Sequence, residues 1–155
     1  MIYKLLAFFH VLSIVVWVGG MFFAHFALRP AVTGLDTSAR LPLMLDVLQR
    51  FFAVVLVAAP VAVITGLWMI GRVARQAAEA GGNFGMPLGW TFMATFGIVM
   101  LLIFGHIRFA LFRRLQRAVQ GQDTNVGIAA LGSIRQWVFA NLVLGLLAIA
   151  SVYLV

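Results

Sequence analysis

The chain has 155 residues, of which 64% are hydrophobic and only 10% are charged. A soluble domain carries roughly 25% charged residues, so this composition excludes an ordinary water-soluble fold and predicts a protein solvated mainly by lipid. The 11 lysines and arginines outnumber the 4 acids, but in a membrane protein such an excess reports topology, and we expect no nucleic-acid partner. The absence of cysteine excludes disulfides, thiolate metal sites and haem attachment through Cys-x-x-Cys-His.

Four apolar segments are each long enough to cross a bilayer, which takes about 20 residues. They cover residues 5–28, 50–71, 88–112 and 135–155. The first segment is too long for the apolar part of a signal peptide, so we expect it to be retained. Short connections join the segments. Residues 1–155 are therefore predicted to form a single domain, an all-α integral membrane antiparallel four-helix bundle.

Positive charges fall unevenly on the two sides of the predicted bundle. Three of them lie on the side of the termini and the second connection, and eight lie on the other side. The positive-inside rule then predicts both termini outside and the first and third connections in the cytoplasm. Tyrosine and tryptophan at the ends of the spans also gather at the outer interface, as aromatic belts do. We therefore expect a multi-pass protein of the bacterial inner (cytoplasmic) membrane.

Two histidines lie at matching depths in the first and third spans. His25 and His106 are both near the cytoplasmic ends, and at 1.5 Å per residue their depths agree to within roughly 5 Å. The first and third helices of such a bundle are diagonal, so inward-facing imidazoles there are suited to ligating one haem b. Arginines at the same interface are candidate partners for the haem propionates, namely Arg29, Arg108, Arg113 and Arg135.

Other roles for these histidines stay open. Either one is also suited to a structural hydrogen bond, to a helix carbonyl or to Asn141 in the fourth span, or to a site for copper or another ion. A histidine inside a membrane is costly enough to suggest a function in each case.

His10 is a separate candidate, because it lies about 22 Å along the helix from His25 and therefore near the outer face. Met69 and Met86 are the best-placed partners, whereas Met93 is close in depth but is expected on roughly the opposite face. A pair of His10 and methionine predicts a second, outer haem or a Cu(I) site, because Cu(I) favours thioethers. Methionine is also ordinary filler in apolar cores, so the role of His10 stays open.

Short motifs in three spans carry a resemblance to a known family. They are His10-Val-Leu, Trp17-Val-Gly-Gly20 and Leu28-Arg-Pro30-Ala in the first span, Arg50-Phe51 and Thr65-Gly66-Leu67 in the second, and Ile134-Arg135 onward to Gly145-Leu146 in the fourth. These segments resemble the CopD family of copper resistance membrane domains. The resemblance implies copper uptake or export across the inner membrane with histidine and methionine ligands, and His10 is the residue most directly carried over.

The first span also resembles two groups of haem proteins. Its histidine and Trp-x-x-Gly segment are similar to the bacterial membrane-bound protoporphyrinogen oxidases, but the lysine of that family after the tryptophan that opens the third span is missing here. Trp90 is followed by Thr91-Phe92-Met93-Ala94, so the resemblance does not extend to that activity. The additional matched histidines, His25 and His106, resemble those of four-helix b-type cytochromes, including quinone-linked ones.

The sequence thus predicts a haem b protein that transfers single electrons within or across the membrane, with a quinone or a redox partner protein. Whether it is a haem-dependent oxidoreductase stays open. The alternatives are a copper transport or resistance protein built on histidine and methionine ligands, and a cofactor-free structural subunit. The Gly19-Gly20 surface allows a homodimer.

Overall fold

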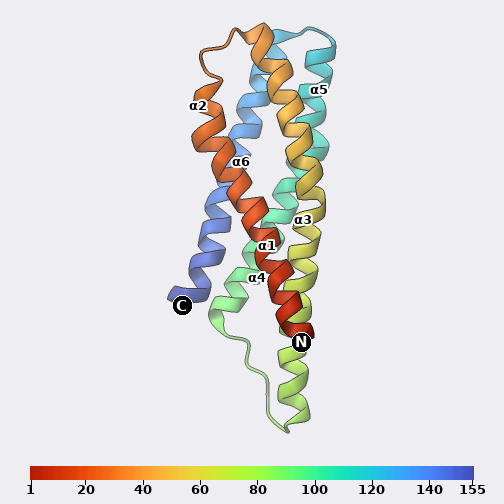
Figure 1. Ribbon diagram of the computed structural model, residues 1–155, viewed down its shortest axis with the longest axis vertical. Helices are drawn as coiled ribbons and strands as arrows, with labels where there is room; N and C mark the ends of the chain where they lie inside the picture. Colours follow the sequence, from red (N-terminus) through yellow and green to blue (C-terminus); the bar gives the residue numbers. More distant parts are fainter.

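The computed structural model describes residues 1–155, which fold into four long helices packed as one antiparallel bundle (Figure 1). The elements are α1 (Ile2–Phe23), the π-helical turn η1 (Ala24–Leu28), α2 (Arg29–Ala31), α3 (Thr37–Glu79), α4 (Leu88–His106), the π-helical turn η2 (Ile107–Leu111), α5 (Phe112–Gln120) and α6 (Thr124–Leu154). Because η1 and η2 join their neighbours without a break, Ile2–Ala31 and Leu88–Gln120 each form one long helix. All four helices are long and apolar enough to cross a membrane, which confirms the predicted all-α membrane bundle.

The helices are longer than the sequence predicts. Residues 37–49 and 113–120 were expected in connections but belong to α3 and α5. Leu41, Met44 and Leu48 explain the extension of α3, since they recur at helical spacing and are all buried. With 43 residues, α3 is about 65 Å long, roughly twice the thickness of a hydrocarbon core. The bundle therefore continues beyond the segments that a bilayer covers.

The two ends of the bundle differ in charge. Both chain termini lie toward one end, here called the termini end, and α3 continues past the N-terminus there (Figure 1). The α2–α3 and α5–α6 connections lie at the opposite end, here called the arginine end (Figure 1). The half of the bundle that leads to it carries Arg29, Arg40, Arg50, Arg108, Arg113, Arg114, Arg117 and Arg135. The charge asymmetry expected from the sequence thus coincides with the long axis of the molecule.

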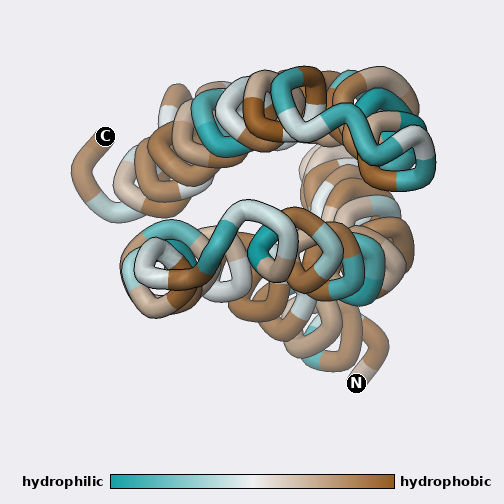
Figure 2. Tube along the Cα trace, turned by 90° about the horizontal axis from the view of Figure 1, so that it is seen from above, coloured by the Kyte–Doolittle hydropathy of each residue, from teal (hydrophilic) through white to brown (hydrophobic).

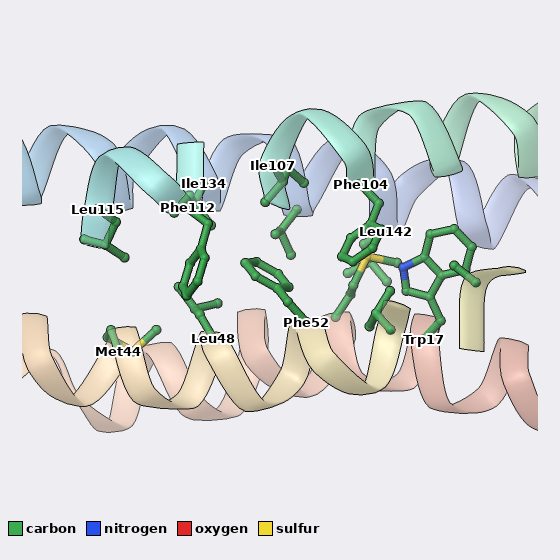
Figure 3. Packing of buried hydrophobic residues seen from close by; sticks show 14 of the residues in the cluster. Trp17, Met44, Leu48, Phe52, Phe104, Ile107, Phe112, Leu115, Ile134 and Leu142 are labelled. Atoms are coloured by element: carbon green, nitrogen blue, oxygen red, sulfur yellow. The ribbon is translucent and has the colours of Figure 1, made fainter. Parts of the chain in front are cut away.

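Four buried aromatic side chains tie together α1, α3, α4 and α5 (Figure 3). Phe52 packs edge-on against Phe104 and Phe112, with ring centroids 5.8 Å and 5.3 Å away. Phe104 in turn packs edge-on against Trp17 at 6.2 Å. Edge-to-face packing brings the positive edge of one ring to the negative face of the next. These four residues, here called the aromatic plug, fill the interior in the arginine half, and none is more than 4% exposed.

The outward faces of the helices are as apolar as the inward ones. Seen along the long axis, hydrophobic residues surround each helix (Figure 2). Large side chains such as Phe8, Val57 and Leu102 are more than half exposed. Water would not tolerate so much apolar surface, whereas acyl chains solvate it. The fold is therefore that of a multi-pass membrane protein in contact with a lipid bilayer.

Gly89 brings α4 and α6 into direct backbone contact near the termini end. The Ser151 hydroxyl donates a hydrogen bond to the Gly89 carbonyl at 3.2 Å and shares its proton with the Ala148 carbonyl at 2.9 Å. A Cβ atom at position 89 would overlap the Ser151 carbonyl oxygen. Backbone cannot swing aside as a side chain can, so only glycine permits this approach.

We expect the substitution Gly89→Ala to force the two helices apart and to lower the free energy of unfolding by about 1–3 kcal/mol, as overpacking does. Thermal unfolding of the detergent-purified protein measures this loss. Gly97→Ala is the matched control, because a Cβ atom at that position of α4 meets nothing within 4 Å. Equal melting temperatures for the two variants would contradict the close contact.

Candidate functional site

The ring of His10 on α1 is held against α3 by two oxygen atoms. Its Nδ1 lies 2.7 Å from the Ala62 carbonyl oxygen and 3.3 Å from Thr65 Oγ1. A carbonyl oxygen only accepts, so Nδ1 carries the proton and donates it, and the neutral ring keeps its lone pair on Nε2. Metal-ligating histidines typically donate their other ring N–H to a carbonyl in this way, which fixes both tautomer and orientation. His10 is thus prepared to bind a ligand through Nε2.

Gly66 makes room for this ring. A Cβ atom at position 66 would lie 2.9 Å from His10 Cε1 and 3.3 Å from His10 Nδ1. The preceding residue, Thr65, is buried, and its hydroxyl donates a hydrogen bond to the Val61 carbonyl. The Thr65-Gly66 pair therefore forms the seat of His10 on α3. This explains in physical terms one of the motifs on which the family resemblance depends.

His10 borders a cavity of about 390 Å³ between α1, α3, α4 and α6, here called the His10 cavity. Its wall is almost entirely apolar and reaches from Trp17 of the aromatic plug to Tyr153 near the C-terminus. Glycine and alanine from three helices leave the space open, namely Ala62, Gly66, Ala94, Gly97, Gly145 and Ala148. Its volume falls in the range of ordinary ligand pockets, about 300–1,000 Å³.

Two methionines of α4, Met93 and Met100, belong to the wall of the same cavity. A Cβ atom at Gly145 would lie 2.9 Å from Val18 Cγ2 and 3.1 Å from Met100 Cε, so Val18 and Met100 share a level. Both helices run toward the arginine end, and Met93 lies seven residues before Met100 as Val11 does before Val18. Met93 is therefore level with His10 to within about one residue rise, 1.5 Å.

This placement differs from the one expected from the sequence. Met93 was assigned to roughly the opposite face, yet it borders the cavity together with His10. Met69 and Met86, the partners expected for His10, are half-buried and do not border it. The difference arises because α4 is apolar on every side, so its sequence gives no polarity signal for the face that turns inward.

His25 and His106 share a level, as the sequence predicts, but the structure does not bring them together. The His25 ring stacks on Phe139 at 4.7 Å, whereas the His106 ring packs against Trp137 at 5.4 Å. Trp137 and Phe139 are two residues apart on α6, so they project roughly 200° apart around the helix. His106 is exposed. The two imidazoles therefore contact different faces of α6.

The reason lies in the local geometry of both helices. His25 is within the π-helical turn η1, and His106 is the last residue of α4 before η2, so the regular 100° step per residue changes at His25 and directly after His106. Leu102, which lies one helical turn before His106 on the same face of α4, is 69% exposed. The buried face of the helix instead carries Phe104 and Ile107, and the aromatic plug occupies the interior at this level.

Of the four arginines expected to bind haem propionates, two lie over phenylalanine rings and two border a second cavity. The Arg108 guanidinium lies over the Phe112 ring at 5.2 Å, and that of Arg113 lies over Phe109 at 5.8 Å. Arg29 and Arg135 border a second cavity, which also includes His25.

Asn141 is 1% exposed, and its Oδ1 has no hydrogen-bond partner. Neither His25 nor His106 therefore bonds to this oxygen.

The fold and the cavity define a multi-pass helical membrane protein with a half-buried imidazole and two thioether groups on the wall of one cavity. Residues 45–155 match the family model of Copper resistance protein D (CopD), and the chain belongs to this family. This finding confirms the resemblance and associates the protein with copper resistance. The match begins within α3, so α1 with His10 lies outside it. No curated protein and no solved structure shows a significant match to the chain.

A double-mutant cycle tests whether the His10 ring and Gly66 are in contact. We expect Gly66→Ala to destabilise the protein by about 1–3 kcal/mol, because the new methyl group meets the imidazole ring. In the double variant Gly66→Ala/His10→Ala this cost should largely vanish, since the clashing ring is gone. Thermal unfolding of the four proteins of this cycle measures the coupling. Strictly additive losses would show that ring and glycine do not touch.

Proposed function

We propose that this protein is a copper transport or resistance protein that binds Cu(I) in the His10 cavity. The observation that carries the proposal is the His10 ring, whose Nδ1–H is bonded to the Ala62 carbonyl, beside a cavity that Met93 and Met100 also border. Membership of the CopD family supports copper as the cargo. The copper ion is the substrate here, and the chain supplies its ligands.

The chemistry of these donors selects among metal ions. An imidazole nitrogen and thioether sulfurs are suited to Cu(I), which is soft. No carboxylate borders the cavity, so Mg²⁺ and Ca²⁺ find none of the oxygen ligands that they prefer there. The site therefore favours monovalent copper over divalent cations.

We expect the purified protein to bind Cu(I) under reducing, anaerobic conditions, measured by competition with a chromophoric Cu(I) chelator. His10→Ala should weaken binding at least about tenfold, the scale on which loss of even a supporting partner acts. Met93→Leu and Met100→Leu keep the volume of the side chain and remove the sulfur, and we expect smaller losses. His106→Ala is the control, because that ring is exposed and distant from the cavity. Unchanged affinity in His10→Ala would refute the proposed site.

Haem b is the second candidate ligand of the His10 cavity. It is supported by the many glycines and alanines on the cavity wall, which leave room for a flat macrocycle, and by His10 as an axial ligand. Haem bound there would supply one-electron chemistry, and the protein would then exchange electrons with a quinone or a redox partner protein.

The visible absorption spectrum of the same preparation separates the candidates. A Soret band that disappears in His10→Ala but persists in His106→Ala favours haem. A colourless protein that binds Cu(I) favours copper, and a colourless one that binds neither favours a cofactor-free subunit.

We further propose that the arginine end faces the cytoplasm, with both termini outside in the bacterial inner membrane. Eight of the eleven positive charges in the arginine half support this orientation. The chain lacks cysteine, so Asn83→Cys in the α3–α4 connection and Gly34→Cys in the α2–α3 connection are unique labelling sites. A membrane-impermeant maleimide should label Asn83→Cys in intact spheroplasts and Gly34→Cys only after lysis. The reverse pattern would invert the orientation.

A further inference from the structure

The geometry points to a second binding site, for the phosphate group of an anionic phospholipid, at the arginine end. The site is a cavity of about 420 Å³ between α2, α3 and α6, here called the arginine cavity. Arg29, Arg40 and Arg135 come from these three helices and border it together. This inference goes beyond the proposed copper function and does not depend on it.

The three arginines have no acidic partners within the protein. The structure contains two ion pairs, Arg50 with Asp46 and Arg75 with Glu79, and neither includes a residue of the arginine cavity. In addition, Arg40 Nε is fully buried and has no hydrogen-bond acceptor. A buried guanidinium N–H without an acceptor is costly, so such groups normally have a partner. An anion in the cavity would supply this acceptor.

The position and walls of the cavity identify the kind of anion. Arg29 and Arg135 stand at the edges of the spans 5–28 and 135–155, the level at which lipid headgroups lie. Met44, Leu131 and other apolar side chains form more than half of the wall, a surface suited to an acyl chain. Guanidinium groups pair with phosphate through two parallel hydrogen bonds, and basic pockets between transmembrane helices bind anionic headgroups.

Thr33 and His25 also border the cavity. His25 stacks on Phe139, which fixes its position beside the arginines. In this site His25 serves as a hydrogen-bonding neighbour of the headgroup, which gives an intramembrane histidine a role without haem. This role also accounts for the position of His25 on the same cavity wall as Arg29, Arg40 and Arg135.

Native mass spectrometry of the detergent-purified protein tests the site with phosphatidylglycerol and with phosphatidylcholine of the same acyl chains. We expect one tightly retained phosphatidylglycerol and little retained phosphatidylcholine. Arg40→Gln should weaken retention about fivefold, and the triple variant Arg29→Gln/Arg40→Gln/Arg135→Gln about a hundredfold, since each arginine near an anionic headgroup contributes about 1 kcal/mol. Arg114→Gln is the matched control, because this exposed arginine of α5 does not border the cavity.

A second variant tests the site without removing charge. Gly132 borders the cavity, and a Cβ atom there meets nothing within 4 Å, so Gly132→Leu should fill the space, expel the lipid and leave the fold intact. If the charge variants do not fold, a photoreactive phosphatidylglycerol bound to the unmodified protein should cross-link to residues bordering this cavity.

Three results would overturn the inference. They are equal retention of both lipids, undiminished retention in the triple and Gly132→Leu variants, and displacement of the lipid by millimolar inorganic phosphate, which would mean a site for a free anion. None of these outcomes bears on Cu(I) binding.

Discussion

The edge-on packing of Trp17, Phe104, Phe52 and Phe112 is the interaction on which the rest of the structure depends. It joins α1, α3, α4 and α5 in a region where the hydrophobic effect cannot hold helices together, since lipid is as apolar as the helix faces. Close packing of large rings supplies the dispersion contacts and the specific geometry that lipid cannot match. By filling the arginine half, the aromatic plug also divides the interior. The His10 cavity begins at Trp17 of the plug, whereas the arginine cavity is bordered by His25, Leu48 and Ile134 in the other half of the bundle.

This division separates two kinds of ligand chemistry. In the termini half the available donors are a neutral imidazole and thioethers, which are soft and carry no charge. At the arginine end they are guanidinium groups, which pair with anions. The proposed cation site and the proposed anion site therefore lie in opposite halves of one small bundle. The same rings lie between the His10 cavity and the arginine end, so an ion bound at His10 passes toward that end only if plug side chains move.

The sequence predicts the number of spans correctly because an uninterrupted apolar run of sufficient length has few other structures open to it. The sequence prediction does not include the N-terminal part of α3 or helix α5, because polar residues interrupt the apolar run there. The apolar residues recur at helical spacing, but only the buried positions of Leu41 and Leu115 in the fold show that these segments are helical. The sequence also fails to identify the inward face of α4, since Met93 lies on a helix that is apolar all round. The π-helical turns, one containing His25 and one directly after His106, change the rotation per residue without a sequence signal. His10 could be identified from the sequence as an ionisable residue in a span. Its contact with Gly66 could not, because it depends on how α1 packs on α3.

The charge distribution links the two proposed sites. Eight arginines in one half of the bundle create a positive potential, which would favour the proposed Cu⁺ ion in the opposite half, where His10 lies, over a position toward the arginine end. Inside a membrane such a potential is weakly screened, so it acts over the length of the helices. An anionic phospholipid in the arginine cavity would neutralise part of this charge at the point closest to the plug. With both proposed sites occupied, the lipid would lower the electrostatic barrier that a Cu⁺ ion meets on its way toward the arginine end, without contacting the ion.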